Sequence, residues 1–178
     1  MWWRNSSVGK SSQAGRPVSS RASTLMGPVV VVPIQASIFD LSNPAPQPGL
    51  RLFKWHAAER DGRWSHGDYA EIYLQPPTGR PPAELRIEML ARVFGTTTTG
   101  PISVEARLET GRPAWLDFPT DEFRHHILDF DLANLQYDGE ELCLWLRRPD
   151  AMSPADAGQG EDERQLGLLV QTLNVVWR

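Results

Sequence analysis

The stretch that decides the fold class is Leu85-Arg86-Ile87-Glu88-Met89-Leu90-Ala91-Arg92-Val93. Apolar side chains occupy every second position, and charged side chains fill the positions between them, with Leu90 as the one exception. Because successive side chains of a strand point to opposite faces of its sheet, this alternation predicts a strand with one face in a core and the other in water. Residues 102–108 repeat the pattern, with Ile, Val, Ala and Leu alternating with Ser, Glu and Arg. Strands of this kind are typical of antiparallel sheets.

Similar runs, each bounded by turn residues, fill the chain from residue 29 onward. They predict about ten strands, at residues 29–34, 37–41, 50–55, 70–74, 85–93, 102–108, 114–118, 127–132, 142–146 and 168–177. Two sheets that face one another would bury the apolar sides of these strands. We therefore expect an all-β fold, an antiparallel jelly-roll-type β-sandwich, with a small closed barrel as the main alternative.

Turn residues mark the connections between these strands. Thr110-Gly111-Arg112-Pro113 predicts a tight hairpin between residues 102–108 and 114–118. Tyr137-Asp138-Gly139 is expected to join residues 127–132 to residues 142–146. A single helical turn is expected at residues 120–123, because Thr120 after Pro119 resembles a capping residue.

The composition bounds the class of protein. A chain of 178 residues fits one domain with a single core. Its one cysteine, Cys143, excludes an internal disulfide and a cysteine-based zinc or iron–sulfur site. The longest apolar run, at residues 29–34, is interrupted by proline and far shorter than the roughly 20 residues of a spanning helix, so we expect no membrane insertion.

Charge divides the chain unevenly. Residues 1–39 carry +4 with no acidic residue, which leaves −8 for the remainder of a chain whose net charge is −4. Residues 1–28 lack apolar periodicity and are predicted to be a disordered, basic, Ser-rich tail before a sandwich domain at residues 29–178. The tail has no secretory apolar region, so the default compartment is the cytoplasm, with a transit peptide as the alternative. The acidic remainder argues against nucleic acid as a partner.

Two segments carry motifs beyond the strand pattern. The first has the form Trp-x3-Glu-x2-Gly-x-Trp-x2-Gly, made by Trp55, Glu59, Gly62, Trp64 and Gly67. The second combines a Ser-Pro loop, an Asp-x-Arg pair and a Leu-Gly-Leu strand start, at Ser153-Pro154, Asp162, Arg164 and Leu166-Gly167-Leu168. Together they resemble the jelly-roll accessory modules of bacterial cell-surface polysaccharide and glycosyltransferase systems. The resemblance implies a non-catalytic module that contacts a glycan or a glycan-synthesising protein, and it allows a role outside the cytoplasm.

The residue types of these segments suit a sugar. Aromatic rings, here including Tyr69, stack on the C–H faces of a pyranose, while carboxylates and imidazoles hydrogen-bond its hydroxyls. The ligand-binding residues predicted on this ground are Trp55, His56, Glu59, Trp64, His66, Asp68, Asp162 and Arg164.

A structural role is the alternative for the same residues. A tryptophan commonly plugs the core of a sandwich, and a glutamate near a glycine turn often accepts backbone N–H bonds. Arg164 is expected to pair with Asp162 or Glu59 and so to fasten the long loop to the sandwich.

Metal and cofactor chemistry has little support in the sequence, and we expect no cofactor. Calcium is an open alternative at four acidic residues without EF-hand spacing, namely Asp156, Glu161, Asp162 and Glu163. His125 and His126 are adjacent, so on a strand they point to opposite faces and cannot easily share one ion.

Two other function classes stay open beside the glycan-binding module. Cys143 lies between leucines like a packed hydrophobe and no Gly-x-Ser-x-Gly occurs, so an enzyme would depend on carboxylates, with Glu59 beside Asp68 or Asp162 acting on a sugar. A protein-docking module is favoured by Trp145 and Tyr73, which fall on the outward faces of their predicted strands.

Overall fold

The computed structural model describes residues 35–79, 81–109, 111–133 and 141–178. Ten strands and one single-turn helix occur in these residues: β1 Gln35–Asp40, β2 Leu50–Phe53, β3 Arg63–His66, β4 Tyr69–Leu74, β5 Glu84–Val93, α1 Thr96–Thr99, β6 Ile102–Leu108, β7 Ala114–Phe118, β8 Arg124–Asp131, β9 Leu142–Arg147 and β10 Leu166–Trp177. The predicted tail at residues 1–28, the predicted strand at residues 29–34 and the Tyr137-Asp138-Gly139 connection lie outside the described residues.

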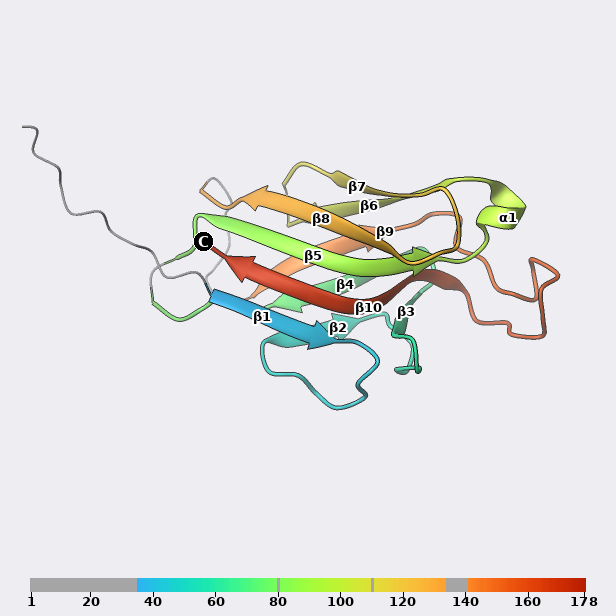
Figure 1. Ribbon diagram of the computed structural model, residues 1–178, viewed down its shortest axis with the longest axis horizontal. Coiled ribbons are helices and arrows are strands. Elements are labelled where there is room, and N and C mark those ends of the chain that lie inside the picture. Colours follow the sequence, from blue (N-terminus) through green and yellow to red (C-terminus); the bar gives the residue numbers. More distant parts are fainter. Residues whose placement is uncertain (1–34, 80, 110, 134–140) are drawn as a thin grey trace, which may run out of the picture. The chain divides into compact units, whose positions relative to one another are not determined.

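The strands form two antiparallel five-stranded sheets that lie face to face, one behind the other in the view of Figure 1. We call the sheet with the order β1-β10-β5-β8 the front sheet; in it, β3 also pairs with the start of β10. The other, which we call the back sheet, has the order β2-β4-β9-β6-β7. The expected sandwich is therefore confirmed. Within the described residues no strand of one sheet pairs with a strand of the other, so the closed barrel was the wrong alternative.

The core lies between the two sheets and follows the alternation of the sequence. Leu85, Ile87, Met89, Ala91 and Val93 all point inward from β5, and each is at most 1% exposed. Opposing side chains come from β4, β6, β7 and β9 of the back sheet. Burial of each large aliphatic side chain contributes roughly 1.5–3 kcal/mol, so this shared core is the main source of stability.

A second, smaller apolar cluster covers the opposite side of β10. It consists of Trp64, Leu166 and Leu169, with Phe94 and Phe123 packed against them. This cluster explains why β10 is apolar on both faces at its start, as expected for a central strand.

Three sequence-based predictions of local structure were wrong or incomplete. Strand β3 was missed, because four residues with one apolar side chain carry no alternation that marks a strand. Residues 120–123 form no helix; the carboxylate of Asp121 instead accepts hydrogen bonds from the backbone N–H groups of Gly95 (3.3 Å) and Thr96 (2.8 Å), at the start of α1. Strands β8 and β9 do not pair, because they lie in different sheets, whereas β6 and β7 do form the predicted antiparallel pair.

Candidate functional site

The two tryptophans of the predicted motif around β3 pack against apolar side chains of the sandwich. Trp64 is 5% exposed, and its indole contacts Leu166 and Leu169 rather than solvent. Trp55 is half-buried, packs against the main core and donates a hydrogen bond from Nε1 to the carbonyl oxygen of Glu71 (3.0 Å). The position of both tryptophans corresponds to the structural alternative, in which they are core side chains.

Two small residues, Ser65 on β3 and Gly167 on β10, bring these strands close together. The hydroxyl of Ser65 accepts a hydrogen bond from the backbone N–H of Leu168 at 2.7 Å. A Cβ atom on Gly167 would lie 2.3 Å from that hydroxyl oxygen, so the contact requires glycine. The residues that carry the family resemblance therefore serve the fold in this structure.

Arg164 joins the two motif segments, as one of the sequence-based alternatives predicted. Its Nη1 donates to Glu59 Oε1 at 2.6 Å, and its Nη2 donates to Asp162 Oδ2 at 2.7 Å. Hydrogen bonds from the side chain and the backbone of Arg164 lower the pKa of Asp162 to about 2, and both carboxylates raise the pKa of Arg164. Glu59 and Asp162 could act as a catalytic acid and base only after their bonds to the Arg164 guanidinium were broken.

The remaining predicted residues lie near this bridge, except for Asp68. The rings of His56 and His66 are 4.8 Å apart, and His56 Nε2 is 3.2 Å from the carbonyl oxygen of Gln165. Asp68 is exposed on another surface, at the start of β4, and is discussed with that surface below.

Metal-ligand groupings are not formed by the described residues. No three His, Cys, Asp or Glu side chains of residues 35–79, 81–109, 111–133 and 141–178 are placed to share an ion. Among the calcium candidates, Asp156 accepts a hydrogen bond from the Ser153 hydroxyl at 2.7 Å. His126 points between the sheets beside Phe118, where burial and then Arg124 lower its pKa, whereas His125 is exposed.

The outer face of the back sheet gathers exposed aromatic side chains, and we call it the aromatic face. Its aromatic members are Phe53 on β2, Tyr69 and Tyr73 on β4, Trp145 on β9 and Trp115 on β7. Three of them are large exposed hydrophobic residues: Phe53 is 48% exposed, Trp145 40% and Trp115 58%. Such a set of outward aromatic rings on neighbouring strands is a typical surface for binding a partner or ligand.

The register of the strands arranges this face in rows that cross the sheet. In one row Tyr69, Arg147, Glu105 and Trp115 are successive partners on β4, β9, β6 and β7. In the next row Phe53, Glu71, Trp145 and Arg107 are successive partners on β2, β4, β9 and β6. Charged side chains therefore lie between aromatic ones along each row.

A hollow of about 280 Å³ lies in the middle of the aromatic face. Its lining comes from β4, β6 and β9 and the turn before β4, and consists of Asp68, Tyr69, Glu105, Arg107, Trp145 and Arg147. The rings of Tyr69 and Trp145 are nearly parallel, with an angle of 16° between their planes and 6.1 Å between centroids. The Nζ atom of Lys54 lies 3.7 Å from the centroid of the Tyr69 ring.

The charged side chains of the hollow are not paired with one another. Among the described residues, Asp68, Glu105, Arg107 and Arg147 form no ion pair and no side-chain hydrogen bond. Their donors and acceptors are available to a ligand.

Beside the hollow, polar side chains of the aromatic face form a network around Tyr73. Glu71 is 7% exposed and accepts a hydrogen bond from the Tyr73 hydroxyl at 2.5 Å, which with burial raises the pKa of Tyr73 to about 12. Arg51 stacks 3.6 Å from the centroid of the Tyr73 ring and pairs with Glu141 at 2.6 Å. This network holds Tyr73 in place. At the hollow, Trp145 is exposed, whereas Tyr69 is half-buried and has the Lys54 ammonium over its ring.

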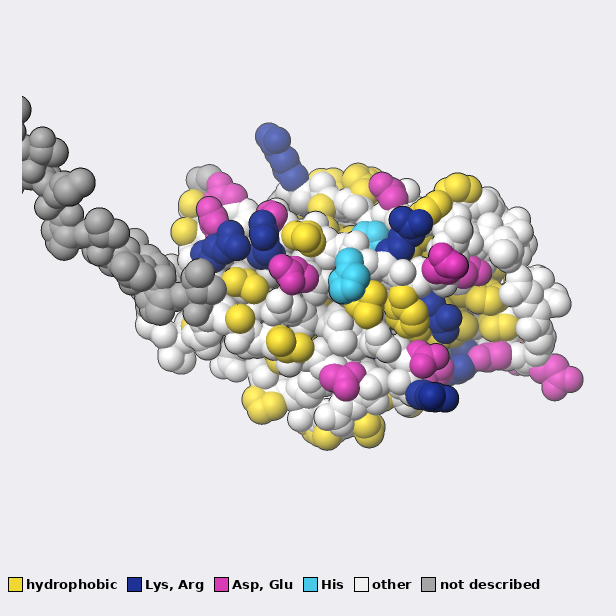
Figure 2. Space-filling model, viewed as in Figure 1, with side chains coloured by type: hydrophobic (Ala, Val, Ile, Leu, Met, Phe, Trp, Pro, Cys, Tyr) yellow, Lys and Arg dark blue, Asp and Glu magenta, His cyan; other side chains and the backbone are white. Residues whose placement is uncertain are grey.

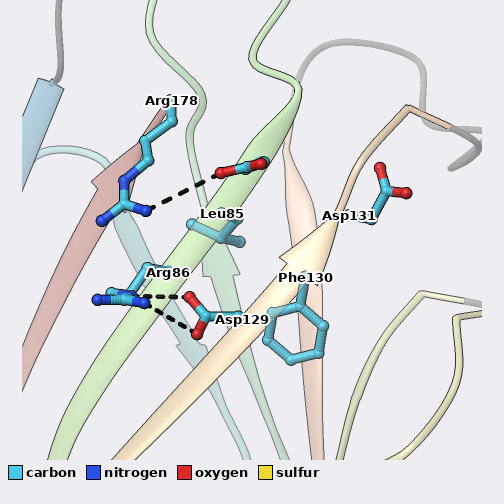
Figure 3. Close-up of a pocket in the computed structure, with 7 residues that line it drawn as sticks. Leu85, Arg86, Asp129, Phe130, Asp131 and Arg178 are labelled. Atoms are coloured by element: carbon cyan, nitrogen blue, oxygen red, sulfur yellow. Dashed lines mark hydrogen bonds and ion pairs between the residues drawn. The ribbon is translucent and has the colours of Figure 1, made fainter.

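A second hollow, of about 400 Å³, lies on the front sheet, between β5, β8 and Arg178 (Figure 3). Arg86 of β5 donates two hydrogen bonds to Asp129 of β8, at 2.7 and 3.0 Å, and Arg178 lies 3.9 Å from Glu84. These charges satisfy one another, in contrast to those of the aromatic face. Figure 2, which views the molecule from the front sheet, shows basic, acidic and hydrophobic side chains intermingled there.

Sequence reasoning found only part of the aromatic face. Tyr69 was named as an aromatic surface, Asp68 as a ligand residue, and Trp145 and Tyr73 as outward-facing side chains. Trp115, Arg107 and Glu105 were missed, although each is an outward residue in a correctly predicted strand, and Arg147, which was also missed, lies one residue beyond the predicted end of β9. Only the register between strands shows that these residues are neighbours, and the alternation of side chains within one strand does not specify that register.

Comparison with known proteins gives no family. No family model and no curated protein matches the chain. Partial likenesses occur to a GH26-CBM35 β-(1,4)-mannanase of Podospora anserina, at 7% identity over 80% of this chain and 28% of that one with a TM-score of 0.42. A second likeness is to the CBM35 from Cellvibrio japonicus Abf62, at 12% identity over 79% of this chain and 92% of that one, with a TM-score of 0.42. A third is to a xylan-binding module CBM15, at 10% identity over 80% of this chain and 96% of that one, with a TM-score of 0.43. TM-scores this low carry no argument about function.

The chain spans 28% of the length of that mannanase. Among the described residues, no helix is long and apolar enough to cross a membrane.

Proposed function

We propose that this protein is a non-catalytic carbohydrate-binding module whose ligand lies on the aromatic face. The observation that carries the proposal is the nearly parallel pair of Tyr69 and Trp145, 16° apart, in the lining of a hollow whose four charged side chains form no ion pair within the described part of the chain. Aromatic faces stack on the C–H groups of a pyranose, and such sites combine apolar surface with a few polar groups that fix orientation.

The charged lining supplies those polar groups. Arg107 and Arg147 each present several N–H donors, and Asp68 and Glu105 present acceptors, so both the oxygen and the hydrogen of a sugar hydroxyl find partners. A hollow of about 280 Å³ is slightly smaller than the usual small-molecule site, roughly 300–1,000 Å³. It therefore suits one or two sugar rings rather than a folded protein domain.

The wider setting of the module is also a proposal. The motif segments resemble accessory modules of bacterial polysaccharide systems, and on that ground we propose a role beside glycan synthesis, with a glycan or a glycan-synthesising protein as partner. The predicted ligand residues around β3 are assigned here to the support of the sandwich, because Trp64 is buried and Glu59 and Asp162 are held by Arg164.

A carboxylate-dependent enzyme acting on a sugar is the second candidate. Its support is that two acidic side chains, Asp68 and Glu105, line the same hollow. Release of new reducing ends from a bound oligosaccharide, lost in both Asp68→Asn and Glu105→Gln, would identify this activity.

Titration calorimetry against neutral and uronic-acid-containing oligosaccharides tests the binding proposal. Trp145→Ala should weaken the binding of any ligand found at least about tenfold, because loss of a buried ring contact of roughly 1.5 kcal/mol or more corresponds to that factor. Ile127→Ala is the matched control, since Ile127 is 60% exposed on the outer face of the other sheet and its loss should leave affinity unchanged. Full affinity in Trp145→Ala, or no binding across the panel, would overturn the proposal.

A further inference from the structure

Trp115 is an exposed aromatic residue of the aromatic face that lies outside the hollow. It lies on β7, the edge strand of the back sheet, and is 58% exposed. Its neighbours along the strand, Ala114 and Leu116, point to the core side, and Leu116 is fully buried. Trp115 belongs to neither of the two hydrophobic clusters that the described residues form.

The strand register places Trp115 in line with the hollow. Tyr69 faces Arg147 across β4 and β9, Arg147 faces Glu105 across β9 and β6, and Glu105 faces Trp115 across β6 and β7. Because neighbouring strands lie about 4.8 Å apart, the two aromatic ends of this row are roughly 14 Å apart. A single sugar ring cannot reach both ends.

We propose that the ligand is an oligosaccharide chain that crosses strands β4, β9, β6 and β7, with one sugar over Tyr69 and Trp145 and a later sugar on Trp115. This inference rests on the proposed function and adds the length and direction of the ligand. Arg147 and Glu105, which lie between the two aromatic ends, offer a donor and an acceptor to the hydroxyls of the sugars in the middle.

The alternation of aromatic and charged side chains supports a chain rather than a protein partner. A protein-docking face of similar size is apolar at its centre, with charged residues depleted there. Here the centre of the row is charged and only its ends are aromatic. A polymer that alternates C–H faces with hydroxyl edges matches this order.

The test is the dependence of affinity on chain length. The probes are β-1,4-linked gluco-, manno- and xylo-oligosaccharides of one to six units, titrated into the full chain and into Trp115→Ala, with Ile127→Ala as the control. In the unaltered protein the affinity for the series that binds should rise at least about tenfold once the chain is long enough to span the row. In Trp115→Ala the shortest ligands should bind as they do to the unaltered protein, and that rise should be lost.

Three outcomes separate the proposals. If Trp115→Ala keeps the whole rise with length, or loses the same factor for every length, the chain-crossing inference is overturned. If Trp145→Ala abolishes binding but affinity does not depend on length, the proposed function stands and the further inference fails. If no ligand of any length binds, both fail. Thermal unfolding of Trp115→Ala within about 2 °C of the unaltered protein confirms that the fold is intact.

Discussion

A Cβ atom on Gly62 would lie 2.3 Å from the carbonyl oxygen of Val170. Gly62 precedes β3 with φ 135°, and it forms reciprocal backbone hydrogen bonds with Glu59 at 2.8 and 3.2 Å. The turn that carries the predicted glycan motif is thus pressed against the backbone of β10, which is held on both sides, by β1 and β3 along one edge and by β5 along the other.

We expect Gly62→Ala to lower the free energy of unfolding by about 3 kcal/mol or more, because strain at a positive φ adds to the clash with backbone atoms. The measurement is urea unfolding followed by circular dichroism. Gly158→Ala is the control, since Gly158 has φ 67° but nothing within 4 Å of an added Cβ, and only the backbone cost of about 1–2 kcal/mol should appear. Equal losses in the two variants would show that the contact with Val170 is unimportant.

Trp64→Ala should lower the free energy of unfolding by about 3–5 kcal/mol, because it empties the small cluster with Leu166 and Leu169. Trp145→Ala, which removes a ring that is 40% exposed, should cost less than about 1 kcal/mol. Denaturant unfolding of the two variants checks the contrast. A stable Trp64→Ala protein would contradict the assignment of Trp64 to the core.

Arg148 carries a further prediction, because it is a buried cation that stabilises the start of β10. The side chain is 2% exposed, and its Nη1 donates to the carbonyl oxygens of Leu166 at 3.2 Å and Gly167 at 2.9 Å. Arg148→Met should lower the free energy of unfolding by about 2–3 kcal/mol, since buried carbonyl groups lose their donors. Arg147→Met, at the neighbouring exposed position, should be nearly neutral in the same unfolding experiment.

Cys143 should be unreactive in the folded protein. Burial, followed by the nearby Glu71 and Glu109 carboxylates, raises the pKa of its thiol to about 12, so almost no thiolate is present at pH 8. We expect Ellman's reagent to detect no thiol at pH 8 until denaturant is added, and then one per chain. Rapid reaction of the folded protein would contradict the burial of this side chain.

Asp162 should make stability depend weakly on acid pH. Its folded-state pKa, about 2, lies below the roughly 3.9 of an unfolded aspartate, so its contribution is present above about pH 4 and is lost as pH falls toward 2. The melting temperature of the unaltered protein should approach that of Asp162→Asn across this interval. Because the pair with Arg164 is solvent-exposed, 1 M NaCl should shrink the difference between the two proteins at pH 6.

The sandwich was predictable because its evidence is local. The alternation in β5 and β6 shows which side chains of each strand face the core, and the structure confirms it residue by residue. What the pattern could not show is whether Trp64 is buried, because a tryptophan beside a turn suits a core and a binding surface equally well. Its burial follows from the pairing of β3 with β10, where the register shifts between Leu166 and Leu169.

The candidate site shows the same division more sharply. Outward positions such as Trp115, Arg147 and Tyr69 can be recognised one strand at a time, and so can the amphipathic character of each strand. Their assembly into one row depends on which strands become neighbours and in which register, and that is set by the packing of the whole core between two sheets. The amino-acid sequence by itself therefore determined which side chains of each strand point inward and which point outward. Only the pairing of strands far apart in the sequence decided which outward side chains share one surface.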